Sequence, residues 1–75
     1  MDDRTHAVRA MLRGMCPSAS IPYIQSFQLP EEEERVLIEC DARRKSVQQV
    51  AMSMNLSAET VWRRRRTALA KIVNT

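Results

Sequence analysis

Apolar residues recur at helical spacing in two short segments close to the carboxyl end of the chain. The first segment has four of them at positions i, i+3, i+4 and i+7: Val47, Val50, Ala51 and Met54. This spacing places all four side chains on one face of a helix. Ser46 is a good N-cap, and Gln49, three residues later, completes a capping box. Asn55 tolerates a left-handed backbone conformation, so the pattern predicts that the helix ends there.

The second segment, from about residue 57 to residue 72, has one apolar and one polar face. Ser57 can cap it. Its apolar side has Val61, Ala68, Leu69 and Ile72. The opposite side has Glu59, Arg63 and Arg66, at positions i, i+4 and i+7. Because the turn between the two helices is very short, the pair predicts a helix-turn-helix.

Three further helices are predicted upstream of this pair. An apolar stripe predicts one from residue 5 to residue 15, with Val8, Met11, Leu12 and Met15. Residues 16–20 look like a connector, and Ser20 with Pro22 then resembles the start of a helix that reaches Phe27. Pro30 is well placed at the first helical position of the third, which ends around Arg43. The chain is therefore expected to be all-α, a small four- or five-helix domain with a C-terminal helix-turn-helix.

Composition agrees with one small helical domain. The chain has 75 residues, 44% of them hydrophobic, with one Gly and three Pro, which argues against disorder and against a disulfide framework. Such a short chain hides only roughly 60–65% of its unfolded surface, so support from a second copy or from a ligand is plausible.

The net charge of +3 hides a strong asymmetry. Residues 1–41 have four basic and eight acidic residues, a net charge of −4. Residues 42–75 have eight basic residues and one acid, a net charge of +7. The positive charge is thus concentrated in and just before the helix-turn-helix, as attraction to phosphate requires.

Other chemistry has little support. Cys16 and Cys40 lack the spacing of metal ligands, and without a signal peptide we expect them to stay reduced in a cytoplasm. No long apolar run predicts a membrane span. His6, the only histidine, has no partner in the sequence that would make it catalytic. We therefore predict no enzyme activity, no catalytic or metal site and no cofactor.

Double-stranded DNA is the partner that the charge pattern favours. An arginine fork can bind a guanine edge or a phosphate, and one helix fits the major groove. The residues before and at the start of the first helix of the pair are phosphate candidates: Arg43, Arg44, Lys45 and Ser46. For the acid run Glu31–Glu34, we favour a helix-start role with pairing to arginines of the last helix over a docking patch for a basic partner. For Tyr23 and Phe27, we favour core packing over base stacking.

The pattern from Leu29 through Val36, Ser46, Val50 and Leu56 to Ile72 resembles region 4 of sigma-70-family factors, which binds the promoter −35 element. It is also similar to small phage transcriptional regulators related to that region and to LuxR-type effector domains. The resemblance covers about residues 29–72 and implies a bacterial or phage origin. It also implies a groove-facing set: Ser57, Ala58, Glu59, Thr60, Trp62 and Arg63. We add Arg66 to this set because it shares the polar face of the helix.

Two departures argue against carrying over the −35 preference. Sigma factors commonly have Arg where this chain has Ala58, and Gln where it has Arg63. Arg65 falls within the apolar arc, so its stem is expected to cover the core and its head to meet one of Glu31–Glu34. Arg64 is also expected to be partly structural. Trp62 has two interpretations, packing on the amino-terminal helices or lying against the sugar-phosphate edge.

We divide the chain into residues 1–28, an N-terminal helical extension for dimerisation or support, and residues 29–75, the DNA-binding domain. One such module buries only about 600–1,000 Å² on DNA, so a homodimer is expected. The leading hypothesis is a sequence-specific, double-stranded-DNA-binding transcription regulator with a recognition helix at about 57–72. The alternative is a protein-interaction module that binds RNA polymerase or another regulator.

Overall fold

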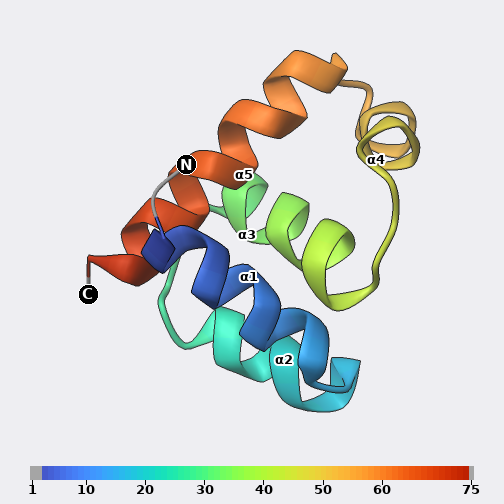
Figure 1. Cartoon of the computed structure of the whole chain (residues 1–75). Coiled ribbons are helices and arrows are strands. Elements are labelled where there is room, and N and C mark those ends of the chain that lie inside the picture. Colours follow the sequence, from blue (N-terminus) through green and yellow to red (C-terminus); the bar gives the residue numbers. More distant parts are fainter. Residues whose placement is uncertain (1–2, 75) are drawn as a thin grey trace.

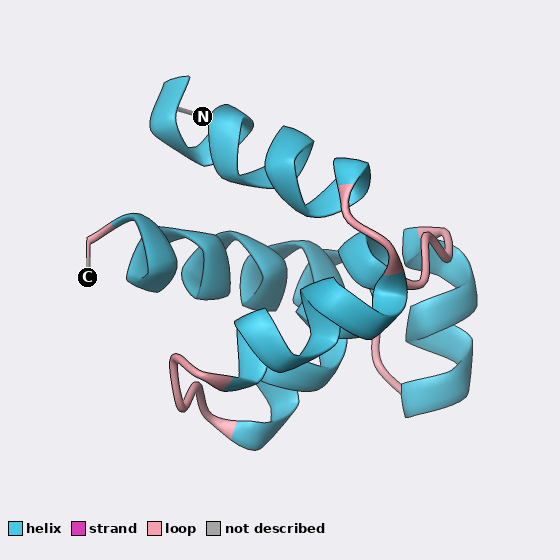
Figure 2. Ribbon diagram, turned by 90° about the horizontal axis from the view of Figure 1, so that it is seen from below, coloured by secondary structure: helices cyan, strands magenta, loops and turns pink. Residues whose placement is uncertain are grey.

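The chain folds into helices joined by short connections, as Figures 1 and 2 show. The structure is a computed structural model that describes residues 3–74. The elements are α1 (Asp3–Gly14), α2 (Pro17–Gln25), α3 (Glu31–Leu37), the wider π-helical turn η1 (Ile38–Ala42), α4 (Val47–Met54) and α5 (Ala58–Val73). The part that is described has no strand, so the predicted all-α class is confirmed. No helix within it is long and apolar enough to cross a membrane.

Local sequence signals set the ends of α4. The Ser46 hydroxyl accepts a hydrogen bond from the backbone N–H of Gln49 at 3.1 Å, and the Gln49 side chain accepts one from the Ser46 N–H at 3.0 Å. This is the predicted capping box. Asn55 ends the helix with φ 59° and ψ 41°, the left-handed conformation that Asn tolerates. Both boundaries of the first helix of the pair are therefore confirmed.

The core consists of two apolar clusters that share α5. One joins the two amino-terminal helices and α3–η1 to the carboxyl half of α5: Leu12, Ile24, Leu37, Ile38, Ala42, Ala68, Leu69 and Ile72. The other joins α3–η1 and α4 to the front of α5: Val36, Cys40, Val50, Ala51 and Val61. Residues of α5 are buried in both clusters, and all of them lie on its apolar face. The opposite face of α5 therefore stays in solvent.

Three predictions about the amino-terminal half need correction. The helix expected to start at Ser20 begins at Pro17, because proline fits the first turn and the Cys16 carbonyl accepts from the N–H groups of both Ala19 and Ser20. Met11, placed on the apolar stripe, is 43% exposed. The third helix begins at Glu31, and Pro30 is its N-cap, not its first helical residue.

An aromatic pair lies beside the core, with Tyr23 on α2 and Phe27 just beyond the end of that helix. Tyr23 and Phe27 stack with ring centroids 5.2 Å apart, and both are half-buried. Phe27 packs against the cluster that includes Leu12 and Ile24. This arrangement agrees with the packing role favoured from the sequence.

Candidate nucleic-acid interface

The front of α5 carries the residues that the sequence singled out for base contacts. Six of them are exposed: Ser57, Ala58, Glu59, Trp62, Arg63 and Arg66. The seventh, Thr60, is half-buried. Of this set, Glu59, Arg63 and Arg66 lie on the side of the helix opposite the buried Val61 and Ala68.

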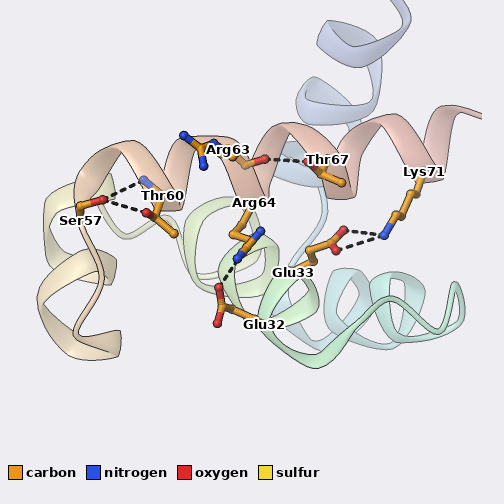
Figure 3. Close-up of polar contacts among 8 residues, drawn as sticks. All are labelled: Glu32, Glu33, Ser57, Thr60, Arg63, Arg64, Thr67 and Lys71. Carbon is orange, nitrogen blue, oxygen red and sulfur yellow. Dashed lines mark hydrogen bonds and ion pairs between the residues drawn. The ribbon is translucent and has the colours of Figure 1, made fainter.

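The start of α5 is fixed by a side-chain cap. The Ser57 hydroxyl accepts a hydrogen bond from the Thr60 backbone N–H at 3.1 Å and donates one to the Thr60 hydroxyl at 2.8 Å (Figure 3). Glu59 lies in the first turn, where the positive end of the helix dipole favours a carboxylate. The cap thus stabilises the first turn of α5, which carries the exposed side chains of Ala58 and Glu59.

Two arginines on this face differ in their contacts. Arg63 donates to the Glu59 carboxylate at 3.2 Å, and both side chains remain largely in solvent, at 65% and 83% exposure. The Arg63 backbone carbonyl accepts from the Thr67 hydroxyl at 2.9 Å (Figure 3). Arg66 forms no ion pair with any residue in the described range 3–74. The face therefore offers one arginine held by an acid and one that is free to bind an external acceptor.

Trp62 lies at the edge of the same face. Its side chain is 41% exposed, and the Arg65 guanidinium lies 5.3 Å from the ring centroid. With Glu59, Arg63 and Arg66, it lines a shallow surface hollow. Packing on Arg65 fixes the ring, while part of its surface stays open to a ligand.

Two other basic residues of α5, Arg64 and Lys71, bind acids of α3 (Figure 3). Arg64 donates to Glu32 at 2.6 Å, and the Lys71 ammonium lies 3.0 Å from both carboxylate oxygens of Glu33. The hydrogen bond to Glu32, and then its charge, raise the pKa of Arg64. The acid run therefore pairs with basic residues of the last helix, as favoured from the sequence.

Arg65 has a different partner from the one predicted. It donates two hydrogen bonds to Asp41 of η1, at 2.9 Å and 2.6 Å, and not to an acid of Glu31–Glu34. The Asp41 side chain is fully buried, and that of Arg65 is 5% exposed. Burial lowers the pKa of Arg65, but its hydrogen bonds to Asp41 and the charge of that carboxylate outweigh this and raise it. The prediction failed because Glu31–Glu34 lie at the start of α3, about two to three helical turns before Asp41.

Asp41 itself was missed in the sequence. It follows Leu37 by four residues and therefore lies on the buried side of its helix. Asp41 and Arg65 each lie on the apolar side of their helix, and this shared position was the signal that they could pair. A buried charge needs such a partner, since desolvation without one is costly.

The linker between η1 and α4 exposes all four phosphate candidates: Arg43, Arg44, Lys45 and Ser46. Glu39 lies 2.6 Å from the Lys45 ammonium and 3.5 Å from the Arg43 guanidinium. Arg44 has φ 59° and donates a hydrogen bond to the backbone carbonyl of Arg13. These contacts hold the linker against the end of α1 without burying its cationic groups.

The structure thus has a capped helix pair with a polar outer face on the second helix. A comparison of the sequence with models of protein families agrees with this arrangement. The family model for region 4 of sigma-70 factors matches residues 27–73. The chain belongs to this family. Region 4 is a DNA-binding helix-turn-helix domain and not an enzyme family. The match spans α3 to α5, whereas α1 and α2 precede it. No curated protein and no solved structure matches the chain.

Proposed function

We propose that this region 4 protein is a transcription regulator that binds double-stranded DNA in a sequence-specific manner, with α5 in the major groove. The observation that carries the proposal is the outer face of α5, where Arg63 and Arg66 are exposed while Arg64 and Arg65 pair with acids of the protein. The helix directs Arg64 and Arg65 toward acids of α3 and η1 and leaves the flanking Arg63 and Arg66 exposed, so the charge of the flanking pair points in one direction. That direction is away from the core, toward an external partner.

The proposed base contacts follow from side-chain chemistry. Arg63 and Arg66 can each donate a fork to the O6 and N7 atoms of guanine, and Glu59 can accept from the N4 amino group of cytosine. Ser57, Thr60 and Trp62 would contact base edges or the adjacent backbone. Ala58, which is exposed at the start of α5, would make only apolar contact, for instance with a thymine methyl group.

The proposed phosphate contacts come from the linker and the start of α4. Arg43, Arg44, Lys45 and Ser46 would bind the sugar-phosphate backbone and fix the orientation of α5 in the groove. Such contacts add affinity for any duplex. The base preference would then depend on α5, and Ala58 and Arg63 make the sigma −35 hexamer an unsuitable guide to it.

We also propose that the chain binds DNA as a homodimer. A single module of this kind buries about 600–1,000 Å² on DNA, which is small for a specific complex. Met11 of α1 is 43% exposed and provides an apolar group on the outer side of the amino-terminal helix. Two copies would bind half-sites about one helical turn apart, which the mass of the complex and the symmetry of the selected sites can test.

The function can be tested by selecting bound duplexes from a randomised library and then titrating salt. We expect enrichment of a defined sequence, and a logarithm of affinity that falls linearly with the logarithm of salt concentration. Affinity for a mixed-sequence duplex should be lower, with a similar dependence on salt. No enrichment, or an affinity that does not respond to salt, would overturn the proposal.

A second candidate function is the binding of RNA polymerase or another regulator. Glu31 is exposed and Glu34 is half-buried, and neither forms an ion pair within the described residues, unlike Glu32 and Glu33. A basic partner surface could therefore bind the start of α3. Loss of polymerase binding on reversing the charge of Glu31 and Glu34, with DNA binding intact, would favour this function.

A further inference from the structure

α1 brings additional arginines next to the predicted phosphate-binding linker. The Arg44 guanidinium donates to the Arg13 backbone carbonyl. A surface hollow also lies between the two segments. Gly14 and Met15, at the end of α1, line it together with Arg43 and Arg44 of the linker. The last turn of α1 therefore lies beside residues proposed to contact DNA, although it precedes residues 27–73 that match region 4.

Arg9 and Arg13 lie near the Asp41 carboxylate, which already accepts hydrogen bonds from another arginine. Both oxygens of Asp41 accept hydrogen bonds from Arg65. The Nε atoms of Arg13 and Arg9 lie 3.6 Å and 3.9 Å from the same Asp41 oxygen, beyond hydrogen-bonding distance. Three guanidinium groups thus surround one carboxylate, which leaves a local charge of about +2.

The two α1 arginines retain unused hydrogen-bond donors. The Arg9 Nε atom is buried without a hydrogen-bond partner in the described chain. Burial first, and then the charge of Arg65, lower the pKa of Arg9, which reflects the excess of positive charge in this cluster. The Arg13 side chain is 52% exposed, so its guanidinium can reach an acceptor outside the protein.

We propose that Arg13, together with Arg44, binds a DNA phosphate and extends the contact surface of the helix-turn-helix onto α1. This inference rests on the proposed DNA-binding function. A phosphate is the acceptor that the cluster lacks, because it supplies negative charge and several oxygens to a site with surplus cationic donors. Arg44, held at the carboxyl end of α1, is already oriented beside Arg13. The amino-terminal helices would then be part of the DNA-binding surface, not only a support for it.

The test compares Arg13→Gln with Arg4→Gln, which removes the same charge from an exposed position nine residues earlier on α1. Binding is measured on a mixed-sequence duplex over a range of salt concentrations. We expect Arg13→Gln to lower affinity about tenfold and to reduce the salt slope by about 0.9, as loss of one phosphate contact should. Arg4→Gln should leave the slope unchanged, and Arg13→Lys should largely restore it. Circular dichroism establishes that each variant is folded.

Footprinting on the selected duplex provides a readout that a structural role would not change. We expect Arg13→Gln to lose protection at one or a few backbone positions at the edge of the footprint, with the protection due to α5 retained. If wild type binds DNA but Arg13→Gln and Arg4→Gln have equal slopes, this inference fails and the proposed function stands. If wild type does not bind DNA, both fail together.

Discussion

Arg65 of α5 and Asp41 of η1 form a two-pronged ion pair inside the protein, with the carboxylate fully buried. The pair joins α5 to the helix that precedes the helix-turn-helix. It also determines which arginines of α5 remain outside, because Arg65 turns inward and Arg63 and Arg66 do not. The inward contact is thus one physical cause of the outward face to which we assign DNA binding.

Removing one member of this pair should destabilise the fold strongly. Asp41→Asn would leave the Arg65 guanidinium buried without a countercharge, and such a change typically costs about 3–5 kcal/mol. Unfolding by urea measures the loss. The control, Glu31→Gln, changes the same charge at an exposed helix start and should cost only about 0.3–1 kcal/mol through the helix dipole. Equal unfolding midpoints for the two variants would contradict a structural role for the pair.

The left-handed residue between α4 and α5 gives a second prediction. Asn55 has φ 59°, so Asn55→Gly should keep or slightly increase the free energy of unfolding, since glycine adopts this conformation without strain. Asn55→Val should lose about 1–2 kcal/mol, because a β-branched residue is strained there. Chemical denaturation of the two variants beside wild type tests the difference. The geometry assigned to the turn would be wrong if valine were tolerated as well as glycine.

The two cysteines should differ in reactivity. Cys16 is exposed, and hydrogen bonds with Ser18 and then with the Ala19 backbone lower its pKa, whereas Cys40 is buried. Because the thiolate is the reactive form, a thiol reagent at neutral pH should modify Cys16 promptly and Cys40 only after unfolding. Mass spectrometry of digested samples locates the label. Early labelling of Cys40 in the folded chain would contradict its burial.

Cys40 also predicts a pH dependence of stability. Burial raises its pKa, so the folded chain holds the thiol proton more tightly than the unfolded chain does. The resulting stability is fully present below the unfolded pKa of about 8.5 and is lost as pH rises toward the folded value. The unfolding midpoint of wild type should therefore fall with pH above about 8.5 more steeply than that of Cys40→Ala. Parallel curves would show that Cys40 does not contribute.

Much of the fold follows from local signals in the sequence. The cap at Ser46, the left-handed Asn55 and the cap at Ser57 each depend on residues within four positions, so a linear pattern contains them. The start of α2 could not be predicted from local signals. Pro17 and Pro22 each fit a helix start, and only packing decides between them. The placement of Met11 in the core was wrong for a related reason. Helical spacing puts it on the apolar stripe of α1, but the neighbouring helices cover only part of that stripe.

The candidate site divides in the same way. The outward direction of Glu59, Arg63 and Arg66 could be predicted from helical period alone. The partner of Arg65 could not, because Asp41 lies 24 positions away and meets it only after α3, η1 and α5 have packed. The contact between Arg44 and the end of α1 likewise depends on tertiary structure and had no signal in the sequence.

The most direct test of the central claim is the affinity of two charge-matched double variants for the selected duplex. Arg63→Glu with Arg66→Glu reverses the outer face of α5, and Arg4→Glu with Arg35→Glu makes the same change of net charge at exposed positions on α1 and α3. Each lost base contact is worth about 1–3 kcal/mol, so the first variant, which loses two, should bind at least about thirtyfold more weakly. The second should stay within a few-fold of wild type. Equal losses, or a greater loss in the second variant, would contradict the assignment of DNA binding to this face.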